Sequence, residues 1–190
     1  LVSVTAGRTT DDLDTHIAEL GELARSAGVD IVDIVTQQRP RVDPKTVLGS
    51  GKLQDLMIRA FQSNIELVIV DQDLTPTQAR NLAERMELRV IDRTQLILDI
   101  FAQRAKTRGG KLQVEVAQLR YRRPRLALMP TAMSRLTGGS GGRGPGETKL
   151  EINRRRADER MNRMEKQLKK LSRDRGLRRG RRRKVGLPQV

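Results

Sequence analysis

A run of four apolar residues, Leu67-Val68-Ile69-Val70, lies between two segments of helical periodicity. Such a run is typical of a strand buried on both faces of a parallel sheet. The stretches 2–5, 31–35 and 89–91, of which 31–35 is mostly apolar, predict three more strands, and the segments between them have the spacing of amphipathic helices. Strands that alternate with helices predict a parallel sheet with right-handed crossovers. We therefore expect a small α/β subdomain, a parallel sheet with flanking helices, over residues 1–104.

The helices of this half carry recognisable end signals. Gly28 stands where the first helix should end, Thr75 and Gln78 have the spacing of a capping box, and Asp92 can cap the helix that follows it. A loop is predicted over 37–50. The helix after it is marked by Leu53, Leu56, Met57 and Phe61. The last helix is expected to bury Leu96, Ile97, Ile100 and Phe101.

The second half has two heptad-like apolar seams, which predict an antiparallel hairpin of long helices over residues 105–176. Gly109 and Gly110 are expected to separate this hairpin from the preceding helix or to kink the chain. The first seam consists of Leu112, Val116, Leu119, Leu126 and Met133, and the second of Leu150, Ala157, Met161, Met164, Leu168 and Leu171. Pro124 and Pro130 are expected to bend or interrupt the first arm, since each removes a helical N–H. The second arm is expected to end near Gly176, before a basic linker over 177–190.

Charge divides the chain at the same place. Residues 1–103 carry a net charge of −5, whereas residues 104–190 carry +20. Such a basic module favours a polyanionic partner, and the scarcity of aromatic residues argues against a stacking platform for single strands. Arginine suits bidentate phosphate contacts. The predicted RNA-binding side chains are Arg120, Arg122, Arg123, Arg125, Arg135, Arg154, Arg155 and Arg156.

A glycine-rich stretch over 138–146 joins the two predicted arms. It reads Gly138, Gly139, Ser140, Gly141, Gly142, Arg143, Gly144, Pro145 and Gly146. A run of this kind is either a flexible linker or a loop at the tip of the hairpin whose shape fits a ligand. Because it contains Arg143 and Pro145 and joins arms that should pack together, we favour a fitted tip that contacts RNA.

Two other features invite a catalytic interpretation. The stretch Gly49, Ser50, Gly51 and Lys52 is similar to a phosphate-binding loop, but that pattern needs glycine where Thr46 stands and a hydroxyl where Leu53 stands. A helix N-terminus there could still hold an anion, so a nucleotide site at these four residues stays open. Asp71, Asp73 and Asp92 follow predicted strands, where solvation and helix capping are the ordinary roles. The single histidine, His16, is expected to be an ordinary helix residue.

Several stretches, in order, resemble the N-terminal region of HflX-type GTPases. They are Leu48-Gly49-Ser50-Gly51-Lys52, Val90-Ile91-Asp92-Arg93-Thr94, Ile97 to Ala105, Gly110-Lys111-Leu112-Gln113-Val114-Glu115 with Ala117-Gln118-Leu119, Gly138 to Thr148, and Arg154-Arg155-Arg156. The resemblance implies a ribosome-associated protein with an α/β subdomain and a helical hairpin. The hairpin's loop would reach rRNA of the large ribosomal subunit near the peptidyl transferase centre. The GTP form of such proteins promotes the splitting of stalled ribosomes, and some members are linked to antibiotic resistance.

The phosphate loop and switch regions of the GTPase domain have no counterpart in these residues. We therefore expect no GTP hydrolysis by this chain, no cofactor in it, and GTP and Mg²⁺ only in the GTPase domain of a longer parent. The sequence has no cysteine, which excludes disulfides and thiolate metal sites, and no run of about 18 apolar residues that could span a membrane. A cytoplasmic protein is the expectation. The alternatives are an ATP-dependent enzyme that uses Gly49 to Lys52 and a general RNA-binding module.

Overall fold

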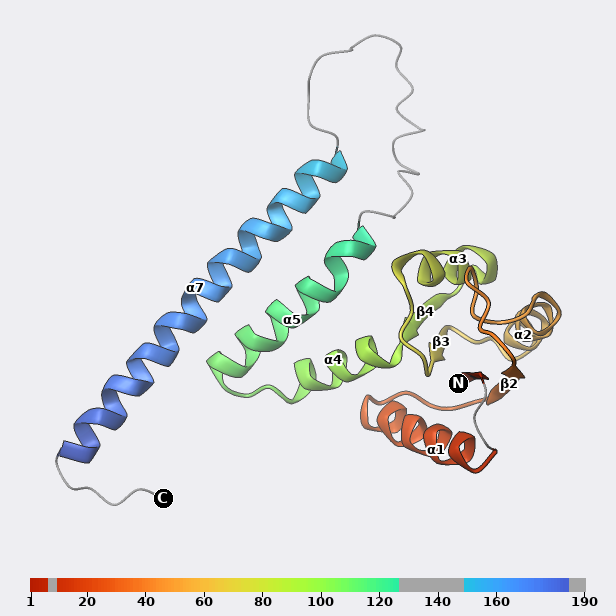
Figure 1. Cartoon of the computed structure of the whole chain (residues 1–190), viewed down its shortest axis with the longest axis horizontal. Helices are drawn as coiled ribbons and strands as arrows, with labels where there is room; N and C mark the ends of the chain where they lie inside the picture. Colours follow the sequence, from red (N-terminus) through yellow and green to blue (C-terminus); the bar gives the residue numbers. More distant parts are fainter. Residues whose placement is uncertain (7–9, 127–148, 185–190) are drawn as a thin grey trace, which may run out of the picture. The chain divides into compact units, whose positions relative to one another are not determined.

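The structure, a computed structural model, describes residues 1–6, 10–126 and 149–184. It divides into two compact units (Figure 1). The α/β unit is Leu1–Arg104, and the hairpin unit contains Ala105–Leu126 and the described residues from 149 on. The predicted Arg135 and the tip from Gly138 to Gly146 lie outside the described residues.

The α/β unit has a four-stranded parallel sheet of strand order β2-β1-β3-β4. The strands are β1 (Val2–Ala6), β2 (Val35–Arg39), β3 (Leu67–Val70) and β4 (Arg89–Asp92). The helices are α1 (Thr10–Ser26), α2 (Ser50–Gln62), α3 (Pro76–Met86) and α4 (Arg93–Arg104). The predicted α/β class and parallel sheet are confirmed.

Helices cover both faces of this sheet (Figure 1). One core contains Val4, Val68 and Val70 from the strands together with Leu53 of α2 and Leu82 of α3. The other contains Ile69 and Ile91 of the sheet with residues of α1 and α4, among them Leu20, Leu96 and Ile100. The alternation along β3, with Val68 and Val70 on one face and Ile69 on the other, explains the continuous apolar run in the sequence.

The predicted strand over 31–35 is wrong, because β2 begins only at Val35, the residue at which that apolar run ends. Register with β1 determines this position, since Val2 pairs with Val35 and Ala6 pairs with Arg39. β2 lies at the edge of the sheet, so polar side chains are tolerated along it. Val32 and Ile34, which contributed to the apolar character of that stretch, are exposed.

Three of the predicted helix ends are confirmed by their contacts. Gly28 has a φ of 77°, Thr75 and Gln78 form a capping box, and the Gln95 N–H donates to Asp92 Oδ1 at 2.9 Å. Two aromatic residues lie away from the core. Phe101, expected on the buried face of α4, is 57% exposed, and Phe61 of α2 is 86% exposed. Each follows a buried residue, Ile100 or Ala60, and one step along a helix turns the side chain by about 100°.

The hairpin unit consists of α5 (Arg108–Leu126) and α7 (Lys149–Lys184), which run antiparallel, since Gly109 contacts Arg175 while Arg123 contacts Asp158. Gly109 and Gly110 lie in the first turn of α5 and not between helices, so that prediction is wrong. α7 also continues through Gly176 to Lys184, past its predicted end. Its arginine and lysine residues are good helix formers, and they offset a glycine penalty of about 1 kcal/mol.

Candidate nucleic-acid interface

Helix α7 concentrates positive charge over 36 residues, of which 17 are Lys or Arg and five are Asp or Glu. Arg154, Arg155 and Arg156 follow one another near its start, so their side chains leave the helix in three directions about 100° apart. All three are exposed. Arg155 Nε lies 3.8 Å from Glu159 Oε1, whereas among the described residues Arg154 and Arg156 have no carboxylate within ion-pair distance. The guanidinium groups of Arg154 and Arg156 are therefore available to an external anion.

Ion pairs connect the two arms of the hairpin. Arg120 Nη2 lies 2.6 Å from Glu165 Oε1, and Arg123 Nε lies 2.6 Å from Asp158 Oδ1. Both of these predicted RNA-binding arginines therefore also have a partner within the protein. An arginine has five N–H donors in a planar fork, and a carboxylate occupies at most some of them. Both guanidinium groups remain about half exposed or more, so each can hold its partner arm and still donate outward.

The last turns of α5 carry the other two predicted arginines that the structure describes. The Arg125 guanidinium lies 3.6 Å from the centroid of the Tyr121 ring, and its Nη1 donates to the Tyr121 carbonyl at 3.1 Å. Stacking on the ring fixes the guanidinium plane and leaves its edge for hydrogen bonds. Arg122 is exposed on the same helix. The structure thus brings Arg120, Arg122, Arg123 and Arg125 together with Arg154, Arg155 and Arg156 on one helical hairpin.

The arms meet along the predicted seam. Val116 of α5 and Met164 of α7 are buried. The seam residues that are partly buried are Leu112, Leu119, Ala157, Met161, Leu168 and Leu171. A hairpin held by an apolar seam and lateral ion pairs is a stiff support for exposed arginines. The ion pairs across the arms were not predicted, because apolar spacing in each helix does not determine their mutual register.

The predicted nucleotide-binding stretch opens helix α2. Gly49 is its N-cap in an extended conformation, and Ser50, Gly51 and Lys52 form the first turn. The Gly49 N–H donates to Gln37 Oε1 at 2.9 Å, and the Arg39 guanidinium lies against Gly49. No acidic residue is present in this first turn. The stretch is a helix entry packed against β2, without the residues that a complete phosphate-binding loop would need.

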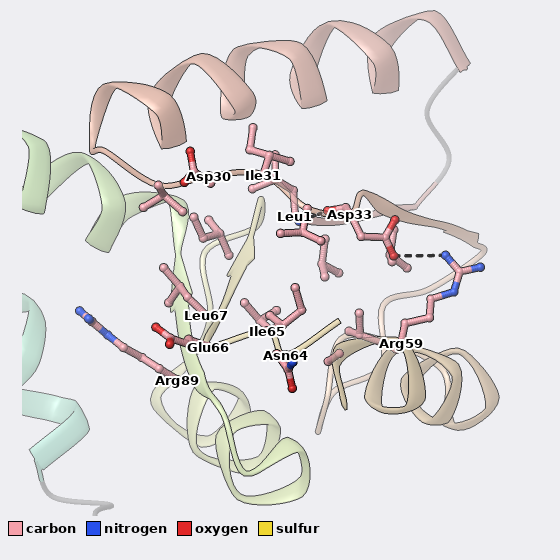
Figure 2. Close-up of a pocket in the computed structure, with 18 of the residues that line it drawn as sticks. Leu1, Asp30, Ile31, Asp33, Arg59, Asn64, Ile65, Glu66, Leu67 and Arg89 are labelled. Carbon is pink, nitrogen blue, oxygen red and sulfur yellow. Dashed lines mark hydrogen bonds and ion pairs between the residues drawn. The ribbon is translucent and has the colours of Figure 1, made fainter. Parts of the chain in front are cut away.

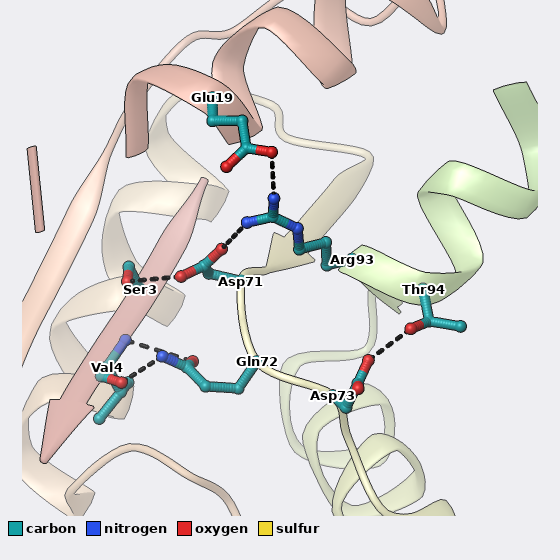
Figure 3. Close-up of polar contacts among 8 residues, drawn as sticks. All are labelled: Ser3, Val4, Glu19, Asp71, Gln72, Asp73, Arg93 and Thr94. Atoms are coloured by element: carbon teal, nitrogen blue, oxygen red, sulfur yellow. Dashed lines mark hydrogen bonds and ion pairs between the residues drawn. The ribbon is translucent and has the colours of Figure 1, made fainter. Parts of the chain in front are cut away.

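The carboxylates at the strand ends all have partners, and Figure 3 shows those of Asp71 and Asp73. Asp71 Oδ2 accepts from Ser3 Oγ at 3.2 Å and Asp73 Oδ1 accepts from Thr94 Oγ1 at 2.5 Å. Asp92 is 1% exposed and accepts from the Leu74 N–H at 3.1 Å as well as from the helix it caps. These contacts are structural, as the ordinary interpretation of strand-end carboxylates predicts.

A cavity of about 500 Å³ lies in the α/β unit (Figure 2). Leu1, Leu67 and Arg89 line it, and they stand at the beginnings of β1, β3 and β4. The cavity is therefore at the amino edge of the sheet, whereas open α/β sheets bind their ligands beyond the carboxyl edge. Its Arg59 is paired with Asp33 at 3.3 Å. This arrangement offers no constellation for catalysis.

The described parts of the chain hold neither a metal-ligand cluster nor a membrane span. Across residues 1–6, 10–126 and 149–184, no three His, Asp or Glu side chains are grouped as metal ligands. None of the helices in those ranges combines the length and apolar character that a membrane crossing requires.

Comparison with known proteins places these two units in one family. A family profile described as GTP-binding GTPase N-terminal matches residues 14–102, and one described as GTP-binding GTPase Middle Region matches residues 104–182. GTPase HflX of Caldanaerobacter subterraneus subsp. tengcongensis is 46% identical over 172 residues, which cover 90% of this chain and 40% of that protein. GTPase HflX of Escherichia coli is 42% identical over 182 residues, with coverage of 95% and 43%.

Solved structures share the fold. The crystal structure of SsGBP with GDP has a TM-score of 0.65 at 19% identity, and covers 92% of this chain and 44% of that chain. A GTP-binding protein from the archaeon Sulfolobus solfataricus in complex with GDP has a TM-score of 0.59, also at 19% identity, with coverage of 90% and 46%.

The chain spans about two fifths of the length of the curated relatives it matches. The two profiles meet at the boundary between the α/β unit and the hairpin unit, where α4 ends at Arg104. The chain belongs to the family of HflX-type GTPases, of which it carries the N-terminal and middle regions.

Proposed function

We propose that the hairpin unit binds rRNA of the large ribosomal subunit. The observation that carries this proposal is the exposed arginine cluster at the start of α7, where Arg154 and Arg156 are without an ionic partner among the described residues. Polyanion binding is driven by phosphate neutralisation and the release of counterions. The family indicates which polyanion is bound, since the resemblance to HflX-type GTPases implies a ribosomal partner.

The proposed interface comprises both arms and the loop between them. Its side chains are Arg120, Arg122, Arg123, Arg125, Arg135, Arg154, Arg155 and Arg156, and the glycine-rich residues from Gly138 to Gly146 would approach the peptidyl transferase centre. Glycine lets a backbone come close to a ligand where side chains would clash. The α/β unit, with its opposite charge, would support the hairpin without contacting RNA directly.

In the longer protein, this interface would serve the splitting or rescue of stalled ribosomes. The GTPase domain would hold GTP and Mg²⁺ and would control the arrangement of the units by its nucleotide state. The present chain would contribute binding and no hydrolysis. An ATP-dependent enzyme centred on Lys52 is less well supported, since the strand-end carboxylates that could serve it are engaged in structural contacts.

The test measures binding of the chain to purified large ribosomal subunits over a range of salt concentrations. A triple variant, Arg154→Glu, Arg155→Glu and Arg156→Glu, should weaken binding. It should also reduce the slope of log affinity against log salt by about 0.7–0.9 for each phosphate that the protein no longer neutralises. The matched control reverses three arginines of the α/β unit, Arg41, Arg85 and Arg89, which gives the same change in net charge.

Equal reductions of affinity in the two triple variants would contradict the proposal, because net charge alone would then explain binding. Competition by an unrelated structured RNA distinguishes specific binding to the large ribosomal subunit from general RNA binding. If that RNA displaces the chain from large subunits at equal nucleotide concentration, the hairpin unit is a general RNA-binding module. Addition of Arg143→Glu to the triple variant tests the contribution of the glycine-rich residues.

A further inference from the structure

A groove of about 410 Å³ runs along the hairpin between Leu112 of α5 and the middle of α7. Leu112 and Met164 give it an apolar side, and three arginines of α7 give it a cationic wall. Arg156, Arg160 and Arg163 are spaced four and three residues apart, so they lie along one flank of the helix. The groove is within the size range of small-molecule sites, about 300–1,000 Å³.

The arginines of this wall differ in their partners. Arg160 donates to Glu115 of α5, which ties its guanidinium to the other arm of the hairpin. Within the described residues, Arg156 and Arg163 have no ionic partner. Glu159 also lines the groove, but its carboxylate lies 3.8 Å from Arg155. The lining thus has three arginines and one glutamate, and Arg156 and Arg163, which make no ion pair within the described residues, lie about 10 Å apart along the helix axis at 1.5 Å per residue.

We propose that this groove binds an unpaired nucleotide of an RNA strand. The base would lie mainly against Leu112, and the phosphates on either side of it would be bound by Arg156 and Arg163. Gln167, which also lines the groove, would hydrogen-bond the edge of the base. This inference rests on the proposed function and deepens it, since it names the RNA feature recognised and adds Arg160, Arg163 and Gln167 to the interface.

The chemistry of the groove favours a nucleotide in a single strand over a base-paired duplex. A duplex presents phosphates and sugars to a protein, for which exposed arginines suffice, whereas an apolar surface is useful only to an unstacked base. Leu112 is the more accessible part of the apolar side, because Met164 is only 9% exposed and belongs to the seam between the arms. Leu112 would therefore take the place of the aromatic platform that this sequence lacks. The basic residues that continue along α7 favour a polymer over a free mononucleotide.

The experiment compares two RNA probes, a stem-loop with an unpaired loop and a blunt duplex of the same stem, by fluorescence anisotropy with the full chain. The groove variant is Arg156→Gln with Arg163→Gln. The matched control is Lys166→Gln with Arg173→Gln, which removes two exposed charges of α7 that do not line the groove. We expect the groove variant to weaken stem-loop binding about tenfold or more and duplex binding much less, whereas the control should weaken both probes by the same factor.

Equal effects of the two double variants on the stem-loop would overturn the groove assignment while leaving RNA binding by the hairpin intact. Failure of the unmodified chain to bind large ribosomal subunits would instead contradict the proposed function. AMP serves as a third probe. Saturable AMP binding that is abolished in the groove variant, with no preference for the stem-loop, would assign the groove to a free nucleotide. Gln167→Ala should reduce the difference between loops of different base sequence, a readout that a purely structural role would not change.

Discussion

Arg93 Nη1 lies 3.3 Å from Asp71 Oδ1, and this contact joins the start of α4 to the end of β3 (Figure 3). The same guanidinium reaches Glu19 of α1, with Nη2 lying 2.5 Å from Oε1. Asp71 also accepts from Ser3 of β1. Arg93 thus connects two helices and two strands at one point, although a cation at a helix N-terminus is unfavourable by itself. The two carboxylates compensate for that position.

Replacement of Arg93 by Gln should destabilise the α/β unit. The Asp71 side chain is only 8% exposed and Arg93 is 24% exposed, so the change takes the cation away from a largely buried carboxylate that still accepts from Ser3. We expect a decrease of about 1–3 kcal/mol in the free energy of unfolding, measured by urea denaturation. The control is Arg89→Gln, which breaks a looser pair with Asp99 at 3.9 Å and should cost less than about 0.5 kcal/mol. Similar decreases in both variants would show that Arg93 is an ordinary surface residue.

Asp43 should give the α/β unit a stability that depends on acid pH. Its Oδ1 accepts from the Thr46 N–H at 2.9 Å and from the Lys45 N–H at 2.8 Å, and these hydrogen bonds, the first above all, lower the pKa of Asp43 below its ordinary value of 3.8. A lowered pKa in the folded state adds stability that is complete above pH 3.8 and is lost as the pH falls through that value towards the folded pKa.

The variant Asp43→Asn keeps an oxygen that can accept the same hydrogen bonds but cannot titrate. We expect it to lose about 1 kcal/mol at neutral pH, because solvent screens this exposed site, and to lose less stability on acidification than the unmodified chain. Urea denaturation at a series of pH values measures both. Parallel pH profiles of the two proteins would contradict the role of Asp43. Lys45→Ala, which leaves the backbone donor in place, is the control.

The pair of Arg123 and Asp158 should stabilise the hairpin through charge and not through side-chain identity. Each single change, Arg123→Asp or Asp158→Arg, places like charges across the arms and should destabilise the hairpin by about 0.5–1 kcal/mol. The double swap restores opposite charges and leaves the net charge of the chain unchanged. Its stability should return most of the way to that of the unmodified chain in a double-mutant cycle followed by thermal denaturation. Additive destabilisation in the double variant would show that the arms do not interact at this pair.

Local signals made much of the α/β unit predictable. Each of these signals involves only a few neighbouring residues, and the structure confirms them. They are the apolar run from Leu67 to Val70, the capping box of Thr75 and Gln78, and the helix cap at Asp92. β2 was misplaced because an edge strand needs no apolar run, and its position depends on the register with β1.

Contacts between distant residues could not be predicted in this way. Gln72 shows why, since its side-chain amide both accepts from the Val4 N–H at 3.3 Å and donates to the Val4 carbonyl (Figure 3). This amide extends the pairing of β1 with β3 beyond their backbone contact, across 68 residues of sequence. The exposed arginines of α7 were predictable from charge alone. The partners of Arg120, Arg123 and Arg160 required the register of the two arms.

Alanine at Gly176 should stabilise the last third of α7. Glycine within a helix costs about 0.5–1 kcal/mol relative to alanine, and a Cβ at this position would meet open space. Amide hydrogen exchange of the residues around 176 should therefore slow about two- to fivefold in Gly176→Ala. Gly28→Ala is the opposite control, because its Cβ also meets nothing but its φ of 77° favours glycine, so this change should destabilise α1 by about 1 kcal/mol. Unchanged or faster exchange in Gly176→Ala would mean that this part of α7 is not helical in solution, and the basic residues beyond it would then reach RNA as an extended segment.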